Sequence, residues 1–384
     1  MNILIAGDFC PQERVAKKFE QDDYEPVLGE VKDVITSADY SIVNYECPIT
    51  EGKEKPIVKK GPSLRCSEKG IEAIKWAGFD CVTLANNHFR DFGDRGVKNT
   101  IEKCKTMDVD TVGGGMNKHE AAAILYKQIE KHTLAIINCC EHEFSIATET
   151  IAGSNPLNPV QQYYKIQEAK KKADYVLVIV HGGHEQFQLP NLRMVETYRF
   201  FIDAGADAVV NHHQHCYSGY EYYKMKPIFY GLGNFCFDKK GKRNSSWNEG
   251  YMLKLKMGNE IGHELFPYVQ CSEYPSVRLM QNEELNEFEK RLKDLNEVIA
   301  DSRKLNNALE KYYDHCARDY VQILEPFKNR YINFLRNKGL IPAFQSEKNL
   351  IKILDYIQCE SHLSKMIYSL KKRACQNKKN EIKI

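Results

Sequence analysis

The segment Asp207-Ala-Val-Val-Asn-His-His-Gln-His215 most constrains how this chain can fold. A short apolar run, Ala208 to Val210, leads directly into three histidines among four residues, a pattern typical of a buried strand that ends at the rim of a sheet. On an extended segment His213 and His215 would point to the same side and could reach one metal ion or two adjacent ones. A histidine cluster can also be purely structural, so this segment alone leaves the question open.

A second strand repeats this arrangement one segment earlier. In Val176-Leu-Val-Ile-Val-His181 five apolar residues end in a histidine, and residues 196–204 between the two strands predict a helix. Two strands that each end in histidine and are separated by a helix indicate a site at the carboxyl edge of an α/β sheet.

Three earlier segments also end in polar residues. A strand over residues 3–6 leads into Gly7-Asp8, a strand over 39–46 ends in Asn44 and Glu46, and a strand over 79–85 leads into two amides and a histidine. Carboxylate, amide and imidazole ligands together suit Mn, Fe or Zn. A carboxylate that bridges two ligand sets is what two-metal hydrolysis requires. The polar residues collected at the predicted strand ends are Asp8, Glu46, Asn87, His88, His181, His213 and His215.

Composition limits the class of protein. The chain has 384 residues and a formal charge of +2, which gives no case for nucleic-acid binding. Its 13 cysteines include no Cys-x-x-Cys pair and are interpreted as reduced thiols. The N-terminal segment lacks the pattern of a signal peptide, and no apolar run reaches about 18 residues. We therefore expect a cytoplasmic protein without a transmembrane segment.

The character of the sequence changes near residue 280. From there to Gly339 there is no glycine, and charged and apolar residues alternate with helical periodicity. This pattern predicts an α/β domain over residues 1–270 and a mostly helical region over residues 281–384. Residues 361–384 contain seven Lys or Arg against one Glu, which indicates either a solvated tail or contact with an anionic surface.

Six short segments, in order and spacing over residues 1 to about 255, are similar to the motifs of one known family. They are Ala6-Gly-Asp8, Ile42-Val-Asn-Tyr-Glu46, Gly78-Phe-Asp through Ala85-Asn-Asn-His88 with Asp91-Phe-Gly93, Ala173-Asp through His181-x-Gly183-x-Glu185 with Pro190, Ile202-Asp-Ala-Gly-Ala-Asp207 through His215, and Lys226 through Phe235. The chain resembles the CapA family, also called the poly-γ-glutamate capsule biosynthesis family, which has a calcineurin-like metallophosphoesterase fold.

The resemblance implies a four-layer α/β/β/α sandwich over residues 1–270, followed by a helical C-terminal appendage. It also implies two divalent metal ions. Asp8, Glu46 and His215 would hold one ion, and Asn87, His181 and His213 would hold the second, with Glu46 as the bridge. His88 would act as proton donor or oxyanion stabiliser, oriented by Asp91.

Four positions depart from the family pattern. Cys10 stands where metallophosphoesterases have a histidine, which would weaken the first metal site; the thiol could be a soft ligand or a small buried apolar group. Asn211 replaces a glycine and Gln214 replaces a proline. Gly182 replaces an aromatic residue, which would leave that side of the cleft more open.

The resemblance implies a metal-dependent hydrolase linked to capsule, poly-γ-glutamate or polysaccharide biosynthesis, in which metal-activated water attacks the substrate. The alternatives are a γ-glutamyl amide hydrolase or transferase, and a non-catalytic partner in polymer synthesis. We expect a small-molecule or anionic polymer substrate, and capsule-synthesis proteins as partners. Arg65, Arg90 and Arg95 are candidate contacts for an anion.

Overall fold

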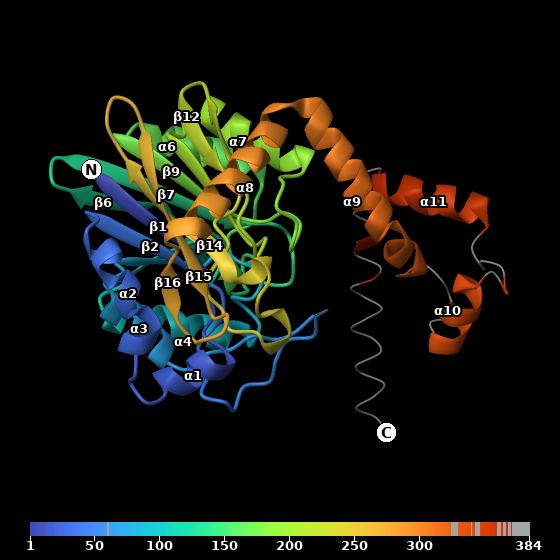
Figure 1. Ribbon diagram of the computed structural model, residues 1–384, viewed down its shortest axis with the longest axis horizontal. Helices are drawn as coiled ribbons and strands as arrows, with labels where there is room; N and C mark the ends of the chain where they lie inside the picture. The colour runs from blue at the N-terminus through green and yellow to red at the C-terminus, as the bar shows by residue number, and fades with distance from the viewer. Residues whose placement is uncertain are drawn as a thin grey trace. The chain divides into compact units, whose positions relative to one another are not determined.

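In the computed structural model of the protein, two stacked β-sheets form the centre of the fold (Figure 1). In the first sheet β1 to β4 are parallel and β14 to β16 are antiparallel. The strand order is β16 (Val277–Leu279), β15 (Gly262–Gln270), β14 (Glu249–Lys256), β1 (Asn2–Phe9), β2 (Tyr40–Tyr45), β3 (Cys81–Thr83) and β4 (Asp110–Val112), with β13 (Asn234–Cys236) paired beside β1.

The second sheet holds both strands that end in histidine. Its four inner strands are parallel, and an antiparallel strand closes each edge. The order is β11 (Tyr220–Tyr223), β12 (Lys226–Phe229), β10 (Ala208–His212), β9 (Tyr175–His181), β7 (His132–Cys140) and β6 (Leu125–Ile129). A separate two-stranded sheet pairs β5 (Gly114–Gly115) with β8 (Gly153–Ser154).

Helices cover the outer face of each sheet. The first sheet packs against α1 (Glu13–Phe19), α2 (Glu25–Thr36), α3 (Lys69–Ala77) and α4 (Gly93–Thr106), and the second against α6 (Pro159–Lys170) and α7 (Leu192–Asp203). The remaining helices are α5 (Lys118–Ala121), α8 (Asn282–Ala300), α9 (Ser302–Ile323), α10 (Arg330–Asn337) and α11 (Glu347–Gln358), with short 3-10 turns at Lys240–Lys242 and Ser246–Asn248. The predicted four-layer architecture is confirmed.

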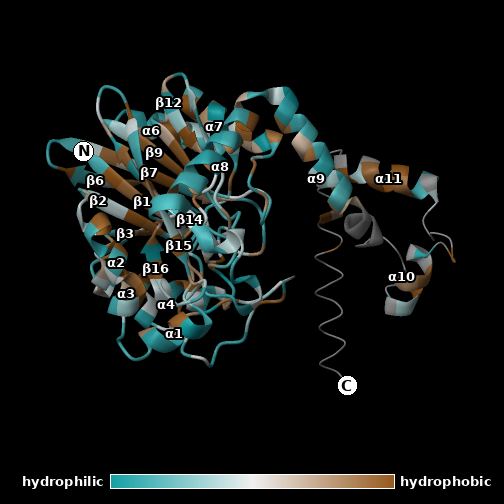
Figure 2. Ribbon diagram, in the orientation of Figure 1, coloured by the Kyte–Doolittle hydropathy of each residue, from teal (hydrophilic) through white to brown (hydrophobic). Residues whose placement is uncertain are grey.

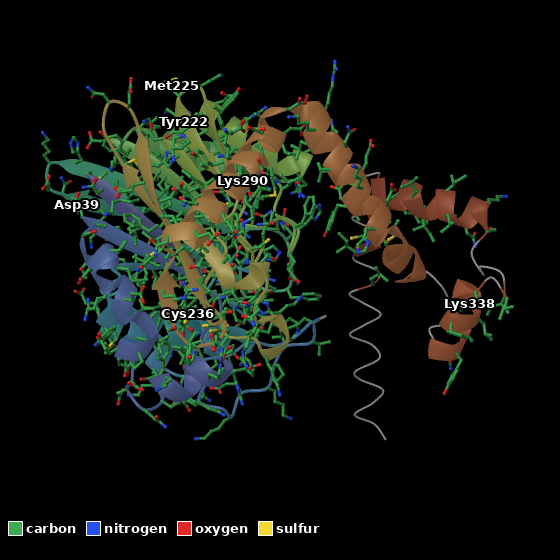
Figure 3. All side chains as sticks on the ribbon, viewed as in Figure 1. Asp39, Tyr222, Met225, Cys236, Lys290 and Lys338 are labelled. Atoms are coloured by element: carbon green, nitrogen blue, oxygen red, sulfur yellow. The ribbon has the colours of Figure 1, made fainter. Side chains whose placement is uncertain are left out.

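Alternation along the strands explains the layers. In β1, Leu4 lies in a core shared with the helices, whereas Ile3 and Ile5 lie in the core between the sheets. Successive side chains of a strand point to opposite faces, so a strand that is apolar throughout builds both cores at once. Figure 2 shows these strands in brown. In Figure 3, Cys236 lies among the packed side chains, and Met225, 73% exposed, lies at the β11–β12 turn.

A bulge in β1 sets the direction of its last residues. Ala6 pairs with Val43 but Asp8 pairs with Asn44, so Gly7 is the extra residue on β1. Leu4 and Ala6, the even-numbered residues before the bulge, face the helices. The bulge reverses this alternation, so that Asp8 points to the same side as Asn44. A glycine directly after an apolar run predicts a turn at Gly7, but the structure has a bulge inside the strand instead.

Two helices begin at different residues from those predicted. The helix between the histidine strands starts at Leu192, because the Asn191 side chain accepts a hydrogen bond of 2.9 Å from the Met194 amide and caps it. Ser67 and Gly78 bracket a segment in which the sequence predicts a helix over residues 67–77 with Ser67 as N-cap. The helix starts at Lys69 instead and ends, as predicted, at Gly78, whose φ of 96° is left-handed.

The chain divides into two units, Met1–Asn306 and Asn307–Ile384. The first unit extends past residue 270 because α8 buries Phe288 and Leu292 in the core between the sheets. The structure describes residues 1–59, 61–323, 329–338, 340–341, 346–358, 362–363, 366–367 and 370. Within these, the region after residue 281 is helical, and no helix is both long and apolar enough to cross a membrane. The basic segment predicted at 361–384 lies almost entirely outside the described residues.

Gly7→Ala tests the bulge. A Cβ at this position would lie 1.9 Å from the carbonyl oxygen of Gly233, so either β1 or the Gly233 backbone must move. We expect the free energy of unfolding, measured by urea denaturation, to fall by about 1–3 kcal/mol. Gly241→Ala is the control, because a Cβ there meets nothing within 4 Å and should change stability by less than about 0.5 kcal/mol. Equal stability of both variants would contradict this account of the bulge.

Candidate metal centre

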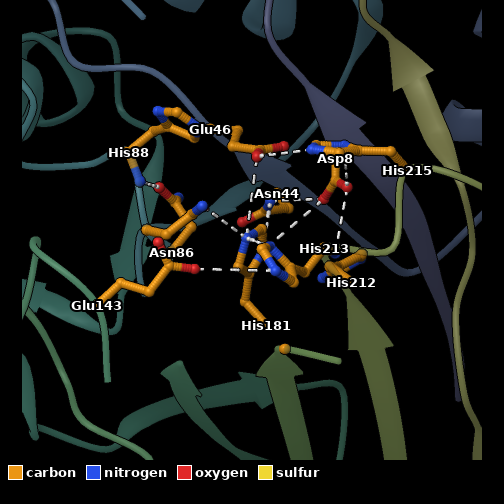
Figure 4. Close-up of polar contacts among 12 residues, drawn as sticks. Asp8, Asn44, Glu46, Asn86, His88, Glu143, His181, His212, His213 and His215 are labelled. Atoms are coloured by element: carbon orange, nitrogen blue, oxygen red, sulfur yellow. Dashed lines mark hydrogen bonds and ion pairs between the residues drawn. The ribbon is translucent and has the colours of Figure 1, made fainter. Parts of the chain in front are cut away.

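The ends of strands from both sheets bring the predicted residues together (Figure 4). Asp8 lies near the end of β1, Glu46 follows β2, and His181 ends β9. His213 and His215 follow β10. Asn87 and His88 lie in the segment after β3. All of these side chains are buried, with at most 7% of any residue exposed.

Glu46 belongs to two groups of side chains that could each hold a metal ion. In one, ligand atoms of Asp8, Glu46 and His215 lie within 4.8 Å of one another, and in the other, those of Glu46, His181 and His213 do. Glu46 Oε1 is 3.7 Å from His215 Nε2 and 3.9 Å from His181 Nε2. The shared carboxylate therefore stands between two ligand sets, with the geometry expected of a bridge.

The Glu46 carboxylate is fully buried, yet neither oxygen has a hydrogen-bond partner among the described residues. Burial and the neighbouring Asp8 raise the pKa of Glu46 well above its usual value. A buried carboxylate without a partner is unfavourable unless a cation compensates it. The two orphaned oxygens and the surrounding imidazoles thus fit divalent metal ions.

Asp8 is held in place by two donors. Asn44 Nδ2 donates a hydrogen bond of 2.7 Å to Oδ1, and the His213 amide donates one of 3.2 Å to Oδ2. Burial alone would raise the pKa of Asp8, but the His215 hydrogen bond and the nearby His181 outweigh burial and lower it. Asn44 was not among the predicted site residues, although its position two residues before Glu46 on β2 is the signal for it.

In the second ligand set, Asn87 and His213 both lie close to Nε2 of His181. His181 Nε2 lies 3.1 Å from Asn87 Oδ1 and 3.0 Å from His213 Nδ1. Burial and the neighbouring His213 lower the pKa of His181 well below its usual value, and burial with His215 lowers the pKa of His213 to about 4. Both imidazoles are therefore neutral near pH 7, which is the form that binds metal.

His213 and His215 reach the site by a different route from the one predicted. They lie in the loop beyond β10, and both have positive φ, 91° and 57°. Alternation on an extended segment is thus the wrong reason for their shared direction. Left-handed backbone is strained for residues with a side chain, and such strain collects at functional sites. Asn234 Oδ1 lies 2.9 Å from His215 Nδ1, and the Trp247 ring packs 4.6 Å from the imidazole.

His88 contacts a buried ion pair. Its Nδ1 lies 2.7 Å from Asp91 Oδ2 and 3.0 Å from Lys59 Nζ, and Lys59 also pairs with Asp91 Oδ1. Burial lowers the pKa of His88, and Asp91 opposes that shift. Residues 51–62 are rich in Lys, Glu, Gly and Pro, a composition that predicts an exposed loop, but only 4% of the Lys59 side chain is exposed. Lys59 was missed because nothing in a local pattern shows that its ammonium turns inward.

A cleft of about 220 Å³ opens onto the site between His88 and His215. Phe237, Lys239 and Trp247 form part of its wall. Outside the two triads, Glu143 Oε1 approaches His213 Nε2 to 3.9 Å. The cleft gives a substrate access to the side of the site where His88 lies.

The departures from the family pattern have structural explanations. Cys10 lies in neither triad and is buried in the core beneath the helices. Asn211 donates to the Gly182 and Tyr230 carbonyls at 2.9 and 3.0 Å. The expectation of an open side at Gly182 is wrong, because Glu141 fills that space and lies 2.6 Å from the position of a Cβ.

Two of the three arginines proposed as anion contacts have surface partners instead. Arg90 pairs with Asp94 at 3.0 Å, and Arg95 pairs with Glu51 at 3.1 Å. The cations beside the site are Lys59 at His88 and Lys239 in the cleft wall.

Glu46→Gln tests the shared carboxylate. Mn²⁺ should raise the unfolding temperature of the wild-type protein, because a ligand at about 100 times its Kd stabilises the folded state by about 2.7 kcal/mol. The amide keeps the shape of the side chain but removes the charge between the ligand sets, so we expect this stabilisation to disappear. Thermal unfolding with and without Mn²⁺ measures it. The exposed Glu289→Gln is the control and should behave as wild type; an undiminished Mn²⁺ effect in Glu46→Gln would refute the site.

Comparison with known proteins agrees with the resemblance seen in the motifs. The family model described as bacterial capsule synthesis protein PGA_cap matches residues 2–239. The capsule biosynthesis protein CapA of Bacillus anthracis is 33% identical over 247 residues, which are 62% of this chain and 60% of that protein. The PGA biosynthesis protein CapA of Bacillus subtilis strain 168 is 32% identical over 242 residues, 62% of this chain and 64% of that protein. The chain therefore spans less than two thirds of the length of either relative.

Among solved structures, a phosphatase from Mycoplasma pneumoniae is similar with a TM-score of 0.45 and 16% identity, over 71% of this chain and 95% of that one. The family match covers more than half of the chain and contains every residue of the two triads. The chain belongs to the bacterial capsule synthesis family PGA_cap.

Proposed function

We propose that the protein is a metal-dependent hydrolase that acts in capsule, poly-γ-glutamate or polysaccharide biosynthesis. The observation that carries the proposal is the Glu46 carboxylate, buried without a protein partner and shared by two ligand triads. A purely structural carboxylate in this position would be expected to have hydrogen-bond donors. The mixed oxygen and nitrogen ligands favour two divalent ions, Mn, Fe or Zn.

Different residues of the chain would hold each of the two ions. Asp8 and His215 would hold one ion, His181, His213 and Asn87 would hold the other, and Glu46 would contact both. Asn44 and Asn234 position Asp8 and His215 through their side-chain amides. When bound, the ions supply polarisation of the scissile group and activation of a water nucleophile.

His88 would act on the substrate directly. It lines the cleft together with His215, and Asp91 holds its Nδ1, which leaves Nε2 as the nitrogen available to a substrate. We infer that His88 in its protonated form donates Nδ1–H to Asp91 and, through Nε2–H, donates a hydrogen bond or a proton to the oxygen of the scissile group. Lys59 keeps Asp91 in place and adds positive charge behind His88.

The substrate would be a small molecule or an anionic polymer. Lys239 in the wall of the cleft and Lys59 behind His88 are the candidate contacts for a negatively charged group, and Glu13, Glu185 and Asp238 line other parts of the cleft. Two relatives are named for capsule and PGA biosynthesis, so we propose a substrate from such a pathway and capsule-synthesis proteins as partners. We also propose a cytoplasmic location, which the free cysteines of the described residues favour.

His88→Asn separates catalysis from metal binding. With Mn²⁺ and p-nitrophenyl phosphate, we expect the wild-type protein to turn over and the variant to lose about 10²- to 10⁴-fold in kcat, because a proton donor contributes that much. Elemental analysis should show the same metal content in both. His213→Ala should lose both metal and turnover, and the exposed His119→Asn should lose neither.

The same assay distinguishes the alternatives. Turnover of γ-glutamyl-p-nitroanilide but not of the aryl phosphate would favour a γ-glutamyl hydrolase or transferase. Stoichiometric metal without turnover of either substrate, or full activity in His88→Asn, would rule against the proposed chemistry. Absence of metal after reconstitution would favour a non-catalytic role in polymer synthesis.

A further inference from the structure

A second groove, of about 670 Å³, lies next to the metal cleft, because residues of the turn Ser246–Asn248 line both. It is bordered by residues 244–249, by the β15–β16 turn and by the first half of α8. Its volume falls in the range of ligand-binding sites and is about three times that of the cleft. None of the predicted site residues lines it.

One short segment separates the groove from the cleft. Trp247 faces the cleft, where its ring packs on His215, whereas Ser246 and Asn248 on either side of it line the groove. The Ser245 side chain caps this turn, and Asn248 Nδ2 donates to the Gln270 carbonyl at 2.9 Å. The wall is therefore a fixed part of the fold, and a long substrate could contact both sides of it.

The charges in the groove are paired with one another. Arg278 donates two hydrogen bonds to Glu284, at 2.7 and 2.9 Å, and Arg291 contacts both oxygens of Glu249, at 2.9 and 3.1 Å. Such two-pronged pairs are held firmly in orientation. Glu273 adds a further carboxylate, so three glutamates face two arginines and the groove carries a net charge of −1. An anionic ligand is therefore disfavoured here.

The other lining groups are mostly neutral. Gln188, Asn244, Ser246 and Ser276 offer amides and hydroxyls, which can both donate and accept hydrogen bonds. Tyr274 lines the groove and is 69% exposed. The face of an aromatic ring carries partial negative charge and packs well against C–H groups.

We propose that this groove binds a neutral oligosaccharide. Sugar hydroxyls match the serines and amides, vicinal hydroxyls can bridge the oriented arginine–glutamate pairs, and the C–H face of a pyranose ring can stack on Tyr274. A peptide or phosphate ligand would use these groups less well, because no unpaired cation lines the groove among the described residues. Binding in the groove would require neither the metal ions nor the proposed hydrolase activity.

Titration calorimetry with the full chain tests the groove. The probes are maltohexaose and chitohexaose, with a γ-linked glutamate oligomer as the anionic comparison. We expect at least one sugar to bind, with an affinity that changes less than about twofold between about 0.05 and 0.5 M NaCl, because screening affects charged ligands. Tyr274→Ala should weaken sugar binding by about tenfold or more, and Tyr274→Phe should preserve it, since stacking needs only the ring.

Tyr164→Ala is the matched control, because Tyr164 is 67% exposed on α6 and does not line the groove. It should bind sugar as the wild type does. Unchanged thermal unfolding of Tyr274→Ala shows that any loss is local. The proposal is overturned if neither sugar binds, if Tyr274→Ala binds sugar normally, or if the glutamate oligomer binds and Tyr274→Ala abolishes it. Turnover of p-nitrophenyl phosphate should be the same in Tyr274→Ala, which keeps this outcome separate from that of the hydrolase proposal.

Discussion

The burial of Glu46 is the constraint on which the rest of the site depends. A carboxylate without donors in the interior is unfavourable by several kcal/mol when ionised. The surrounding residues do not relieve this by hydrogen bonding to Glu46. Instead Asn44 donates to Asp8, and Asn234 lies within hydrogen-bonding distance of His215. The side-chain amides of Asn44 and Asn234 thus orient neighbouring ligands while Glu46 is left without a partner, an arrangement that favours function over the stability of the metal-free fold.

Distortions of the backbone position the ligand side chains around Glu46. The Gly7 bulge turns Asp8 toward Asn44, and left-handed φ angles turn His213 and His215 inward from the loop after β10. Each distortion carries strain or close approach that a regular strand would avoid. Because all of them lie at or beyond the carboxyl ends of strands, the rest of both sheets remains regular. The regular sheets therefore hold the distorted ends in place.

The sequence predicted those features of the fold and the site that depend on a local pattern of residues. Apolar runs that end in His181 or Asp8 predicted both the strands and the edge at which they meet, and the motif order predicted the layers. The inward turn of Lys59 and the burial of α8 through Phe288 could not be read in this way, because both depend on partners far along the chain. The position of Asn44 on β2 could be predicted from the sequence. Its role could not, because that role depends on the bulge that brings Asp8 opposite Asn44.

The metal cleft and the neighbouring groove differ in the cations that they offer, and this difference bears on how a polymer substrate would be recognised. Lys239 lines the cleft together with Glu13, Glu185 and Asp238, whereas the arginines of the groove are already paired with glutamates. Metal ions bound at the site would attract an anionic group to the cleft, and the groove offers no such charge, so a uniformly charged polymer would not occupy both. A molecule that joins a neutral sugar portion to one anionic group would satisfy both surfaces across the Trp247 wall. Recognition and chemistry would then be carried out by different surfaces of the same unit.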